Sequence, residues 1–528
     1  MKKKHIHFIG IGGTAMASIA VAFRHAGFKI TGSEPHEIFP PMSDYLKKNK
    51  IKYYFPFDPK KIGKPDEIVI GNAHYSDENV EVKYARENNI ELEHFPRLLE
   101  KYFIKKNSIV VAGTYAKTTI TAMAAWLFEA AGKNPSYMLG GIPLNFQHGA
   151  RLSSINFKPS LEEVFEKTLT TCPSVRREVG MKKDIWSIAE GDEYPAASPW
   201  DYSSKFDFYH PKYLILSSTE WDHFDIFKTK RDYINSFINL VKSIPKDGLI
   251  VAKSGGENIS GVLKKVKCKI VYYSREKRKE KRERNINDKK DLYYIDDIKY
   301  QDGIIKFSVF KNRNLIGNFE TSLIGDFNLE NWCAAITLAN ELKLPLKKIQ
   351  AGVKSFIGVR RRLEIRFPNH FGRSLKNKTL ATCWFVRRGA GKNIIIIDDF
   401  AHSPSKARGS AQALAKYFPG SRIFVVFEPN RGGRALKCMK NYYNIFSNIY
   451  KIFIPKLSQY KKKPGVYDVS GKELAMHLKK SHKNIVYQPD NQKILKSIIK
   501  SVRSGDVVAF MGSRNFDILI KQLINKIL

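Results

Sequence analysis

Short runs of β-branched and aliphatic residues recur along the chain, and several are followed by a glycine-containing turn and then by apolar residues at helical spacing. The clearest case predicts a buried strand over residues 109–111, a tight loop over 113–117 and a helix over 118–130. Buried strands that alternate with helices are typical of parallel sheets. The pattern therefore predicts an α/β protein.

The same order opens the chain at residues 5–31, which predict a strand, the turn Gly10-Ile11-Gly12-Gly13, a helix and a second strand. Glycines in such a turn let backbone amides approach a pyrophosphate, and Glu34 stands where an acid can meet a ribose hydroxyl. By itself this pattern also fits an NAD-dependent oxidoreductase or a purely structural turn.

The loop at 113–117 has the chemistry of a phosphate site. A helix that begins directly after a strand and a loop points its unpaired backbone N–H groups at an anion in that loop. Lys117 adds a positive charge, and Thr118 adds a hydroxyl in the place where P-loop proteins hold Mg²⁺. The loop reads GTYAKT, so the complete pattern G-x-x-x-x-G-K-[ST] is not present. We nevertheless expect this loop to bind ATP.

Carboxylates gather after two further predicted strands, within residues 186–194 and 213–227. The first strand ends in Glu190, Asp192 and Glu193, and the second is followed by Glu220, Asp222, His223 and Asp225. The carboxyl ends of parallel strands meet at one edge of a sheet, where ligands bind in α/β proteins. Acids at that edge, beside a Lys-Thr loop, predict a metal-nucleotide site.

A third unit begins near residue 358, with predicted strands starting at 394, 422 and 506 and helices between them. Just before it, residues 323–342 predict a Gly-Asp turn and a helix for which Asn328 can serve as the N-cap. Three polar or strongly charged stretches are expected to be surface loops or insertions, at residues 153–183, 275–291 and 367–392.

Length and composition set the scale of the molecule. A chain of 528 residues exceeds what one core supports, and we expect about three domains, at 1–103, 104–358 and 359–528. No apolar run is long enough to span a membrane, and the N-terminus passes into a strand without a signal peptide, so we expect a cytoplasmic protein. Five scattered cysteines without C-x-x-C spacing favour neither a disulfide framework nor a zinc site.

The formal net charge of +39 also fits a basic ATPase that binds nucleic acid. The lysines, however, are spread along the whole chain and form no single stripe. We therefore expect no specific nucleic-acid partner, and we expect the charge to help attract anionic nucleotides.

Nine segments together resemble the Mur ligase family over nearly the whole chain, because they follow one another in the order of that family. They are FIGIGGTAMA at 8–17 and the segments 32–46, 71–79, 112–119, 189–194, 214–227, 325–331, 360–366 and 398–404. The resemblance implies a Rossmann-like N-terminal domain for a UDP-sugar, a central P-loop-type ATPase domain with a mixed sheet, and a Rossmann-like C-terminal domain for the amino substrate.

The resemblance also implies a reaction. Members of the family use ATP and Mg²⁺ to convert a carboxylate to an acyl phosphate, which an amine captures as an amide. Within the family the chain resembles the branch that joins UDP-N-acetylmuramate to the tripeptide L-Ala-γ-D-Glu-meso-diaminopimelate in peptidoglycan recycling. The sibling reaction, in which free L-alanine is added to the same UDP-sugar, is the alternative.

Site residues follow from the matched segments. The resemblance implies that Lys117 bridges the β- and γ-phosphates, that Thr118 and Glu190 hold Mg²⁺, and that His223 holds a second metal ion; these four are the expected catalytic residues. Further ATP contacts are implied for Gly113, Thr114, Thr119, Asn331, Arg362, Asp399 and His402, with Asn331 at the adenine and Asp399 at the ribose. The implied pyrophosphate contacts of the UDP-sugar are Gly10, Gly12 and Gly13, with Ser33 at their edge.

The chain departs from the family at Tyr115-Ala116, where relatives have His-Gly. If position 116 adopts a positive φ, alanine costs about 1 to 2 kcal/mol there, and we expect weakened but retained ATP binding. The segments 428–431 and 511–515 also depart from the family pattern, and we expect them to influence the choice of amino substrate.

Overall fold

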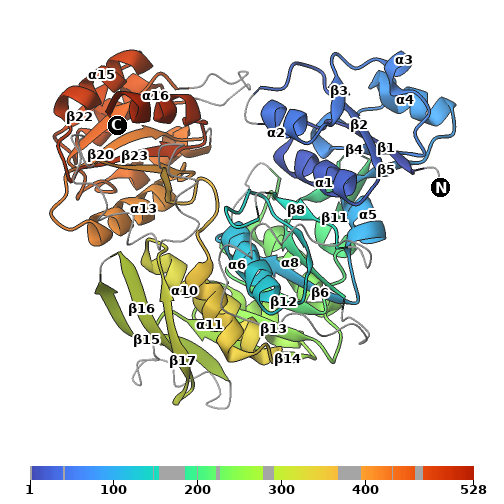
Figure 1. Ribbon diagram of the computed structural model, residues 1–528, viewed down its shortest axis with the longest axis horizontal. Coiled ribbons are helices and arrows are strands. Elements are labelled where there is room, and N and C mark those ends of the chain that lie inside the picture. The colour runs from blue at the N-terminus through green and yellow to red at the C-terminus, as the bar shows by residue number, and fades with distance from the viewer. Residues whose placement is uncertain are drawn as a thin grey trace, which may run out of the picture.

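The computed structural model describes residues 3–39, 42–146, 148–153, 185–198, 200–221, 226–276, 291–301, 303–366, 394–430, 432–457 and 468–527. The described chain forms three α/β units, each built on its own sheet. Figure 1 shows the N-terminal unit in blue and the C-terminal unit in orange to red, on either side of the central unit. The predicted α/β class and the three-part architecture are confirmed; the expected boundaries at 103/104 and 358/359 stay predictions.

The N-terminal sheet is parallel, with the order β3-β2-β1-β4-β5. Its central strand β1 (His5–Ile9) is buried along its whole length, and α1 (Thr14–His25) follows the glycine turn as predicted. The other strands are β2 (Lys29–Ser33), β3 (Lys52–Tyr54), β4 (Glu67–Ile70) and β5 (Leu92–His94), and the other helices are α2 (Met42–Lys48), α3 (Pro59–Ile62), α4 (Val80–Glu87) and α5 (Phe95–Leu98). The short helices η1 (Asn72–His74) and η2 (Leu99–Phe103) complete this unit.

The central sheet has ten strands in the order β17-β16-β15-β14-β13-β12-β6-β9-β7-β8. Strand β6 (Asn107–Ala112) lies parallel to β9 (Trp186–Gly191) on one side and to β12 (Tyr213–Leu216) on the other, so the carboxyl ends of all three meet. The remaining strands of this sheet are β7 (Ser136–Met138), β8 (Ala150–Arg151), β13 (Leu249–Lys253), β14 (Lys269–Ser274), β15 (Leu292–Gln301), β16 (Ile304–Lys311) and β17 (Asn314–Thr321).

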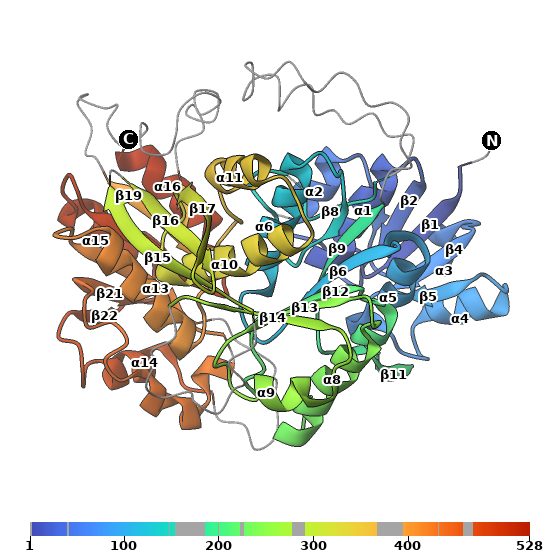
Figure 2. The ribbon, with the colours of Figure 1, turned by 90° about the horizontal axis from the view of Figure 1, so that it is seen from below.

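Helices cover both faces of the central sheet. Figure 2 shows α6 (Lys117–Ala130), α10 (Asp326–Glu341) and α11 (Leu346–Ser355) on one face, and α8 (Lys230–Ser243) and α9 (Ile259–Val262) on the other. Short elements near the sheet are the hairpin of β10 (Pro195–Ala197) and β11 (Asp201–Ser204), and the helices η4 (Lys205–Phe208) and η5 (Leu263–Lys265). The parallel strands β6, β9, β12 and β13 are almost wholly buried between these helical layers, which explains why they are continuous apolar runs.

The C-terminal sheet has the order β18-β19-β23-β20-β21-β22, and only β18 (Glu364–Arg366) runs antiparallel to its neighbour. The other strands are β19 (Ile395–Asp399), β20 (Ile423–Glu428), β21 (Lys451–Ile454), β22 (Ile485–Tyr487) and β23 (Val507–Gly512). Its helices are α13 (Pro404–Tyr417), η8 (Gly432–Arg434), η9 (Leu436–Tyr442), α14 (Gly471–Leu478), α15 (Asn491–Ser501) and α16 (Asp517–Ile527).

The structure corrects one local prediction. Asn328 is not an N-cap, because α10 begins at Asp326 with Gly325 in the capping position, and Asn328 is buried inside the first turns. Its side-chain amide instead donates to the carbonyl of Ile324 at 2.7 Å. The predicted insertions at 153–183 and 367–392 and most of the charged run at 275–291 lie outside the described residues. Among the described residues, no helix is both long enough and apolar enough to cross a lipid bilayer.

Candidate functional site

The phosphate loop is fixed by the neighbouring strand. It connects β6 to α6, and the Ser218 hydroxyl, just beyond β12, accepts the backbone N–H groups of Thr114 and Tyr115 at 3.1 Å each. The Ser217 hydroxyl donates to the Tyr115 carbonyl at 2.6 Å. Gly113 has a φ of 135°, and a Cβ there would lie 2.3 Å from the Ser217 oxygen, so only glycine fits. These contacts attach the loop to the end of β12.

Lys117 stands at the start of α6 and faces the acids after β9. Its ammonium lies 2.9 Å from Glu193 Oε2 and 4.0 Å from Asp192 Oδ1. Burial lowers the pKa of Lys117, but the carboxylates of Glu193, Asp192 and Glu190 outweigh burial, and the net effect raises it. Lys117 is therefore positively charged and available to phosphate oxygens.

Thr118 and Glu190 meet as the sequence predicted. The Thr118 hydroxyl donates to Glu190 Oε1 at 2.9 Å, and the backbone N–H of Gly140 donates to Oε2 at 2.6 Å. Burial and the negative charge of Asp192 raise the pKa of Glu190. A cation in addition to Lys117 would offset the repulsion between Glu190 and Asp192. The Thr118 hydroxyl and the Glu190 carboxylate are oxygen ligands of the kind that Mg²⁺ prefers.

The third expected metal residue, His223, lies outside the described residues. Within the described ranges, no three His, Cys, Asp or Glu side chains form a cluster that could hold a metal ion unaided. Thr118 and Glu190 fit an ion that takes its other ligands from nucleotide phosphates. The chain would then supply only part of the coordination.

Ala116 adopts the left-handed conformation that the family glycine would favour. It is the N-cap of α6, with φ of 63° and ψ of 0°. Position 116 therefore has the positive φ at which alanine is strained, because residues other than glycine, asparagine and aspartate rarely occupy this region.

The glycine turn of the N-terminal unit lies close to acidic and aromatic side chains. The Gly10 N–H donates to the Ser33 carbonyl at 2.9 Å, and the Gly12 N–H donates to Glu34 Oε1 at 2.5 Å. His74 lies 3.6 Å from the other Glu34 oxygen. Gly13 precedes α1, and nothing lies within 4 Å of where its Cβ would be, so its face of the turn is open.

Ser33 does not present its side chain to that open face. It is fully buried, and its hydroxyl donates to Glu81 Oε2 at 2.5 Å. Glu81 also accepts from the Tyr54 hydroxyl at 2.7 Å and from the Asp58 N–H at 2.9 Å. Any contact of Ser33 with a UDP-sugar would therefore use its backbone.

A cavity of about 190 Å³ lies between the N-terminal and central units. Its N-terminal wall is formed by Ala15 and Met16 of α1, together with Gly71, Asn72, Phe95 and Pro96. Its central wall is formed by Met138, Gly140, Glu190, Asp192, Ala196, Lys205 and Tyr209. The cavity thus extends from the helix after the glycine turn to the carboxylates beside the phosphate loop.

The C-terminal residues group around the joint between β18 and β19. Arg362 lies with its guanidinium 5.2 Å from the centre of the Phe400 ring, and His402 Nδ1 is 2.6 Å from the Phe400 carbonyl. Asp399 is buried and accepts the Leu363 N–H at 3.2 Å and the Ser410 hydroxyl at 2.5 Å. Both Asp399 oxygens therefore accept hydrogen bonds from within the protein.

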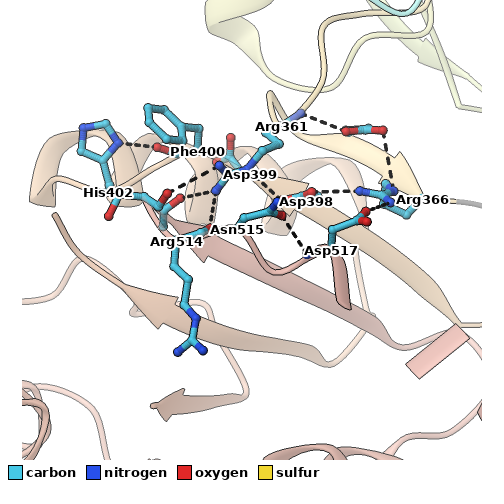
Figure 3. Close-up of polar contacts among 12 residues, drawn as sticks. Arg361, Arg366, Asp398, Asp399, Phe400, His402, Arg514, Asn515 and Asp517 are labelled. Carbon is cyan, nitrogen blue, oxygen red and sulfur yellow. Dashed lines mark hydrogen bonds and ion pairs between the residues drawn. The ribbon is translucent and has the colours of Figure 1, made fainter. Parts of the chain in front are cut away.

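Figure 3 shows Asp398 between two arginines at the same joint. Arg366 contacts Asp398 Oδ2 at 3.0 Å, and Arg361 lies 3.5 Å from Oδ1 while donating to the Gly512 carbonyl at 2.7 Å. These contacts tie the linker at 361–366 to β19 and β23. They fix the direction in which Arg362 and the loop at 400–402 leave the sheet.

The remaining expected ATP contacts come from the central and C-terminal units. Lys406 of α13 lies 5.8 Å from the Tyr115 ring, so the C-terminal unit reaches the phosphate loop. Asn331 lies in the central unit, buried on α10, and donates to Asn328 at 3.2 Å. Thr119 is buried in the first turn of α6. The structure therefore brings together Lys117, Thr118 and Glu190, whereas the roles of Asn331 and Asp399 in ATP binding stay predictions.

The sequence did not single out Lys205, Gly140 or Tyr209, all of which line the cavity. Gly140 could have been found from the Gly/Pro turn that follows β7. Lys205 stands in no motif and is brought to the cavity by the β10–β11 hairpin, so the linear sequence carried no signal for it.

Three family models match the chain in the order of its units. They are described as the Mur ligase family catalytic domain at residues 5–106, the Mur ligase middle domain at 111–339, and the Mur ligase glutamate ligase domain at 385–514. Each model overlaps one of the three sheets.

Similar proteins carry two kinds of name. UDP-N-acetylmuramate–L-alanine ligase from Clostridium acetobutylicum is 27% identical over 97% of this chain and 95% of its own length. The solved UDP-N-acetylmuramate-alanine ligase from Thermotoga maritima matches 99% of this chain and 98% of its own, with a TM-score of 0.72 and 22% identity, which supports the fold. A solved UDP-N-acetylmuramate:L-alanyl-γ-D-glutamyl-meso-diaminopimelate ligase from Neisseria is 27% identical over 68% of this chain and 100% of its own, with a TM-score of 0.55.

Proposed function

The chain belongs to the Mur ligase family of ATP-dependent ligases that form amide bonds, and we propose that it joins L-alanine to UDP-N-acetylmuramate. This proposal takes up the alternative of the sequence analysis. It is supported by curated relatives that carry this name and are 25–27% identical along almost the whole chain. Because ATP and UDP-sugars are cytoplasmic metabolites, we place the reaction in the cytoplasm.

One observation carries the proposed chemistry. Lys117, Thr118 and Glu190 lie together where the phosphate loop meets the acidic end of β9, and Glu190 also lines the cavity that reaches α1. A nucleotide sugar bound at the glycine turn would extend its carboxylate through that cavity toward the γ-phosphate of ATP. An in-line transfer needs such an arrangement of the two reactants.

The reaction has two steps. The carboxylate attacks the γ-phosphorus, the bond to ADP breaks, and an acyl phosphate forms. The amine then attacks the acyl carbon, and the amide forms as phosphate leaves and the amine loses its proton. When bound, Mg²⁺ would neutralise charge that develops on the phosphoryl oxygens.

Side chains and backbone N–H groups of the chain would bind the nucleotide and the metal ion. Lys117 would leave Glu193 for the β- and γ-phosphates, and the N–H groups at the start of α6 would donate to the same anion. Thr118 and Glu190 would hold the metal ion. The C-terminal unit, whose Lys406 already approaches Tyr115, would close over the nucleotide and exclude water from the acyl phosphate.

A second candidate is the tripeptide ligase reaction with the same UDP-sugar, the main prediction of the sequence analysis. The solved tripeptide ligase that matches 68% of this chain at 27% identity favours it. Both reactions use the same acid and the same acyl phosphate, so they differ only in the amine that the C-terminal unit admits. The tripeptide reaction would place the protein in peptidoglycan recycling, and the alanine reaction in peptidoglycan synthesis.

An amide-ligation assay tests the proposal. The wild-type chain would be incubated with UDP-N-acetylmuramate, ATP and Mg²⁺, with L-alanine or the tripeptide as the amine, and the products identified by mass. We expect ligation with L-alanine at a higher kcat/KM than with the tripeptide, and none by Lys117→Ala with either amine. The reverse preference would support the second candidate, and no ligation with either amine would refute both.

A further inference from the structure

The cavity between the N-terminal and central units is lined by more acidic than basic side chains. Two carboxylates, Glu190 and Asp192, belong to its wall. Among the described residues that line it, Lys205 is the one cationic side chain. An anionic ligand can bind beside these two carboxylates only if a positive charge in the cavity offsets their repulsion.

Lys205 is held in place by its backbone and by its neighbours. It is the first residue of η4, which begins with a capping box in which Ser204 and Asp207 bond each other's backbone N–H groups. The Lys205 N–H donates to the Tyr194 carbonyl at 3.0 Å, and its ammonium lies 5.5 Å from the centre of the Tyr194 ring. The side chain is only 17% exposed, so its ammonium has little freedom to turn toward bulk water.

Two lysines lie near different oxygens of Asp192. Lys205 lies 3.6 Å from Asp192 Oδ2, whereas Lys117 lies 4.0 Å from Oδ1 and is bonded more closely to Glu193. Lys117 thus belongs to the phosphate loop, and Lys205 belongs to the cavity that leads to α1. The long contact between Lys205 and Asp192 leaves the ammonium with hydrogen-bonding capacity for another oxygen.

We propose that Lys205 binds the carboxylate of the nucleotide-sugar acid and holds it between the glycine turn and the phosphate loop. The proposal rests on the proposed function, because it concerns the acid substrate of that reaction. Lys205 would offset the repulsion of Glu190 and Asp192 and would accept the carboxylate in a charge-assisted hydrogen bond. Its role is distinct from that of Lys117, which serves the nucleotide phosphates.

The test compares two ligands that differ in the carboxylate. UDP-N-acetylmuramate carries the lactyl acid, whereas UDP-N-acetylglucosamine is the same nucleotide sugar without it. Binding of both would be measured by calorimetry without ATP, on the full wild-type chain and on Lys205→Met, Lys205→Arg and Lys212→Met. Lys212→Met is the matched control, because Lys212 pairs with Asp247 at 2.6 Å and does not line the cavity.

Loss of one charge-assisted hydrogen bond predicts that Lys205→Met binds UDP-N-acetylmuramate about 10- to 100-fold more weakly. The same variant should bind UDP-N-acetylglucosamine within about 2-fold of wild type, Lys205→Arg should restore part of the lost affinity, and Lys212→Met should change neither ligand.

The remaining outcomes distinguish a failure of the role proposed for Lys205 from a failure of the proposed function. Equal weakening of both ligands by Lys205→Met would show that Lys205 only supports the wall or neutralises Asp192, and it would overturn the proposal. Unchanged binding of UDP-N-acetylmuramate would overturn it as well. A wild-type chain that binds neither nucleotide sugar would overturn the proposed function, and this inference with it.

Discussion

Position 116 shows how one residue can set the strength of the phosphate site. Ala116 caps α6 in the left-handed region, so the backbone keeps the conformation that a glycine loop would have and pays in strain. Ala116 directly precedes Lys117, the first residue of α6, so its backbone conformation sets the direction in which the helix leaves the loop. The identity of residue 116 therefore affects how readily the loop adopts the conformation that binds phosphate.

Ala116→Gly should relieve about 1 to 2 kcal/mol of strain and lower the KM for ATP by about 5- to 10-fold. Initial rates at varied ATP would measure it. Lys343→Gly is the control, since Lys343 has a φ of 58° at the end of α10 and is exposed. It should stabilise the fold similarly without changing the KM. An unchanged KM in Ala116→Gly would show that the alanine does not weaken ATP binding.

Residue types alone did not reveal how Ser33 and Asp399 are used. Both stand in family motifs, but the structure buries their side chains in internal hydrogen bonds to Glu81, and to Leu363 and Ser410. A sequence motif shows that a polar residue stands at a position, but it does not show which group that residue hydrogen-bonds. Lys117, Thr118 and Glu190 were predictable because strand ends in a parallel sheet have only one edge at which to meet.

At the scale of elements, the phosphate site is a product of three neighbouring strands. Strand β6 leads into the loop, β9 carries Glu190 next to its last residue, and Ser217 and Ser218 follow β12 and contact the loop. The alternation of buried strands, glycine turns and helices made this order predictable. The resemblance predicted a mixed sheet, but no local pattern located the antiparallel strands β15, β16 and β17. Strand β15 directly follows the charged run, and β15 and β17 carry many exposed residues, so neither is a continuous apolar run.

Ser218→Ala tests whether β12 holds the loop. The Tyr115 N–H would lose its bond to the Ser218 hydroxyl, whereas the Thr114 N–H would keep its 3.2 Å bond to the Ser218 carbonyl. The loss should cost about 1 to 3 kcal/mol of stability and raise the KM for ATP by about 10-fold. Urea unfolding and ATP kinetics would measure the two effects. Ser308→Ala removes a similarly buried hydroxyl from β16 and should lower stability alone. A KM that is the same in both variants would mean that Ser218 has no part in shaping the site.

At the scale of the whole molecule, the reaction depends on how the three units are held together. The N-terminal and central units share one apolar cluster, and the contact is extended by His148, whose Nδ1 lies 3.1 Å from the Tyr45 hydroxyl. The His25 ring packs edge-on against it at 5.0 Å. The three-unit arrangement was predictable only through the ordered motifs, since no local pattern specifies how separate sheets dock.

Acid should loosen this contact. Burial, with His25 and Lys48 nearby, lowers the pKa of His148 to about 4, whereas an unfolded histidine titrates near 6.5. Between these values the unfolded chain binds more protons, so stability falls as the pH falls. Since His148 is partly exposed, we expect a loss of about 1 to 2 kcal/mol between pH 7.5 and 5.

Urea unfolding at the two pH values would measure this loss in wild type and in His148→Gln, which should lose less. His210→Gln removes an exposed histidine outside this contact, and it should lose as much stability as wild type. Equal acid sensitivity of wild type and His148→Gln would remove His148 as its cause.

The central claim is that the carboxylate of UDP-N-acetylmuramate is phosphorylated before an amine captures it, and an isotope experiment tests it most directly. UDP-N-acetylmuramate labelled with ¹⁸O in its carboxylate would be ligated by the wild-type chain with ATP, Mg²⁺ and the preferred amine. Mass spectrometry of the released phosphate should find one ¹⁸O atom for each amide formed. Amide formation with unlabelled phosphate would contradict the account.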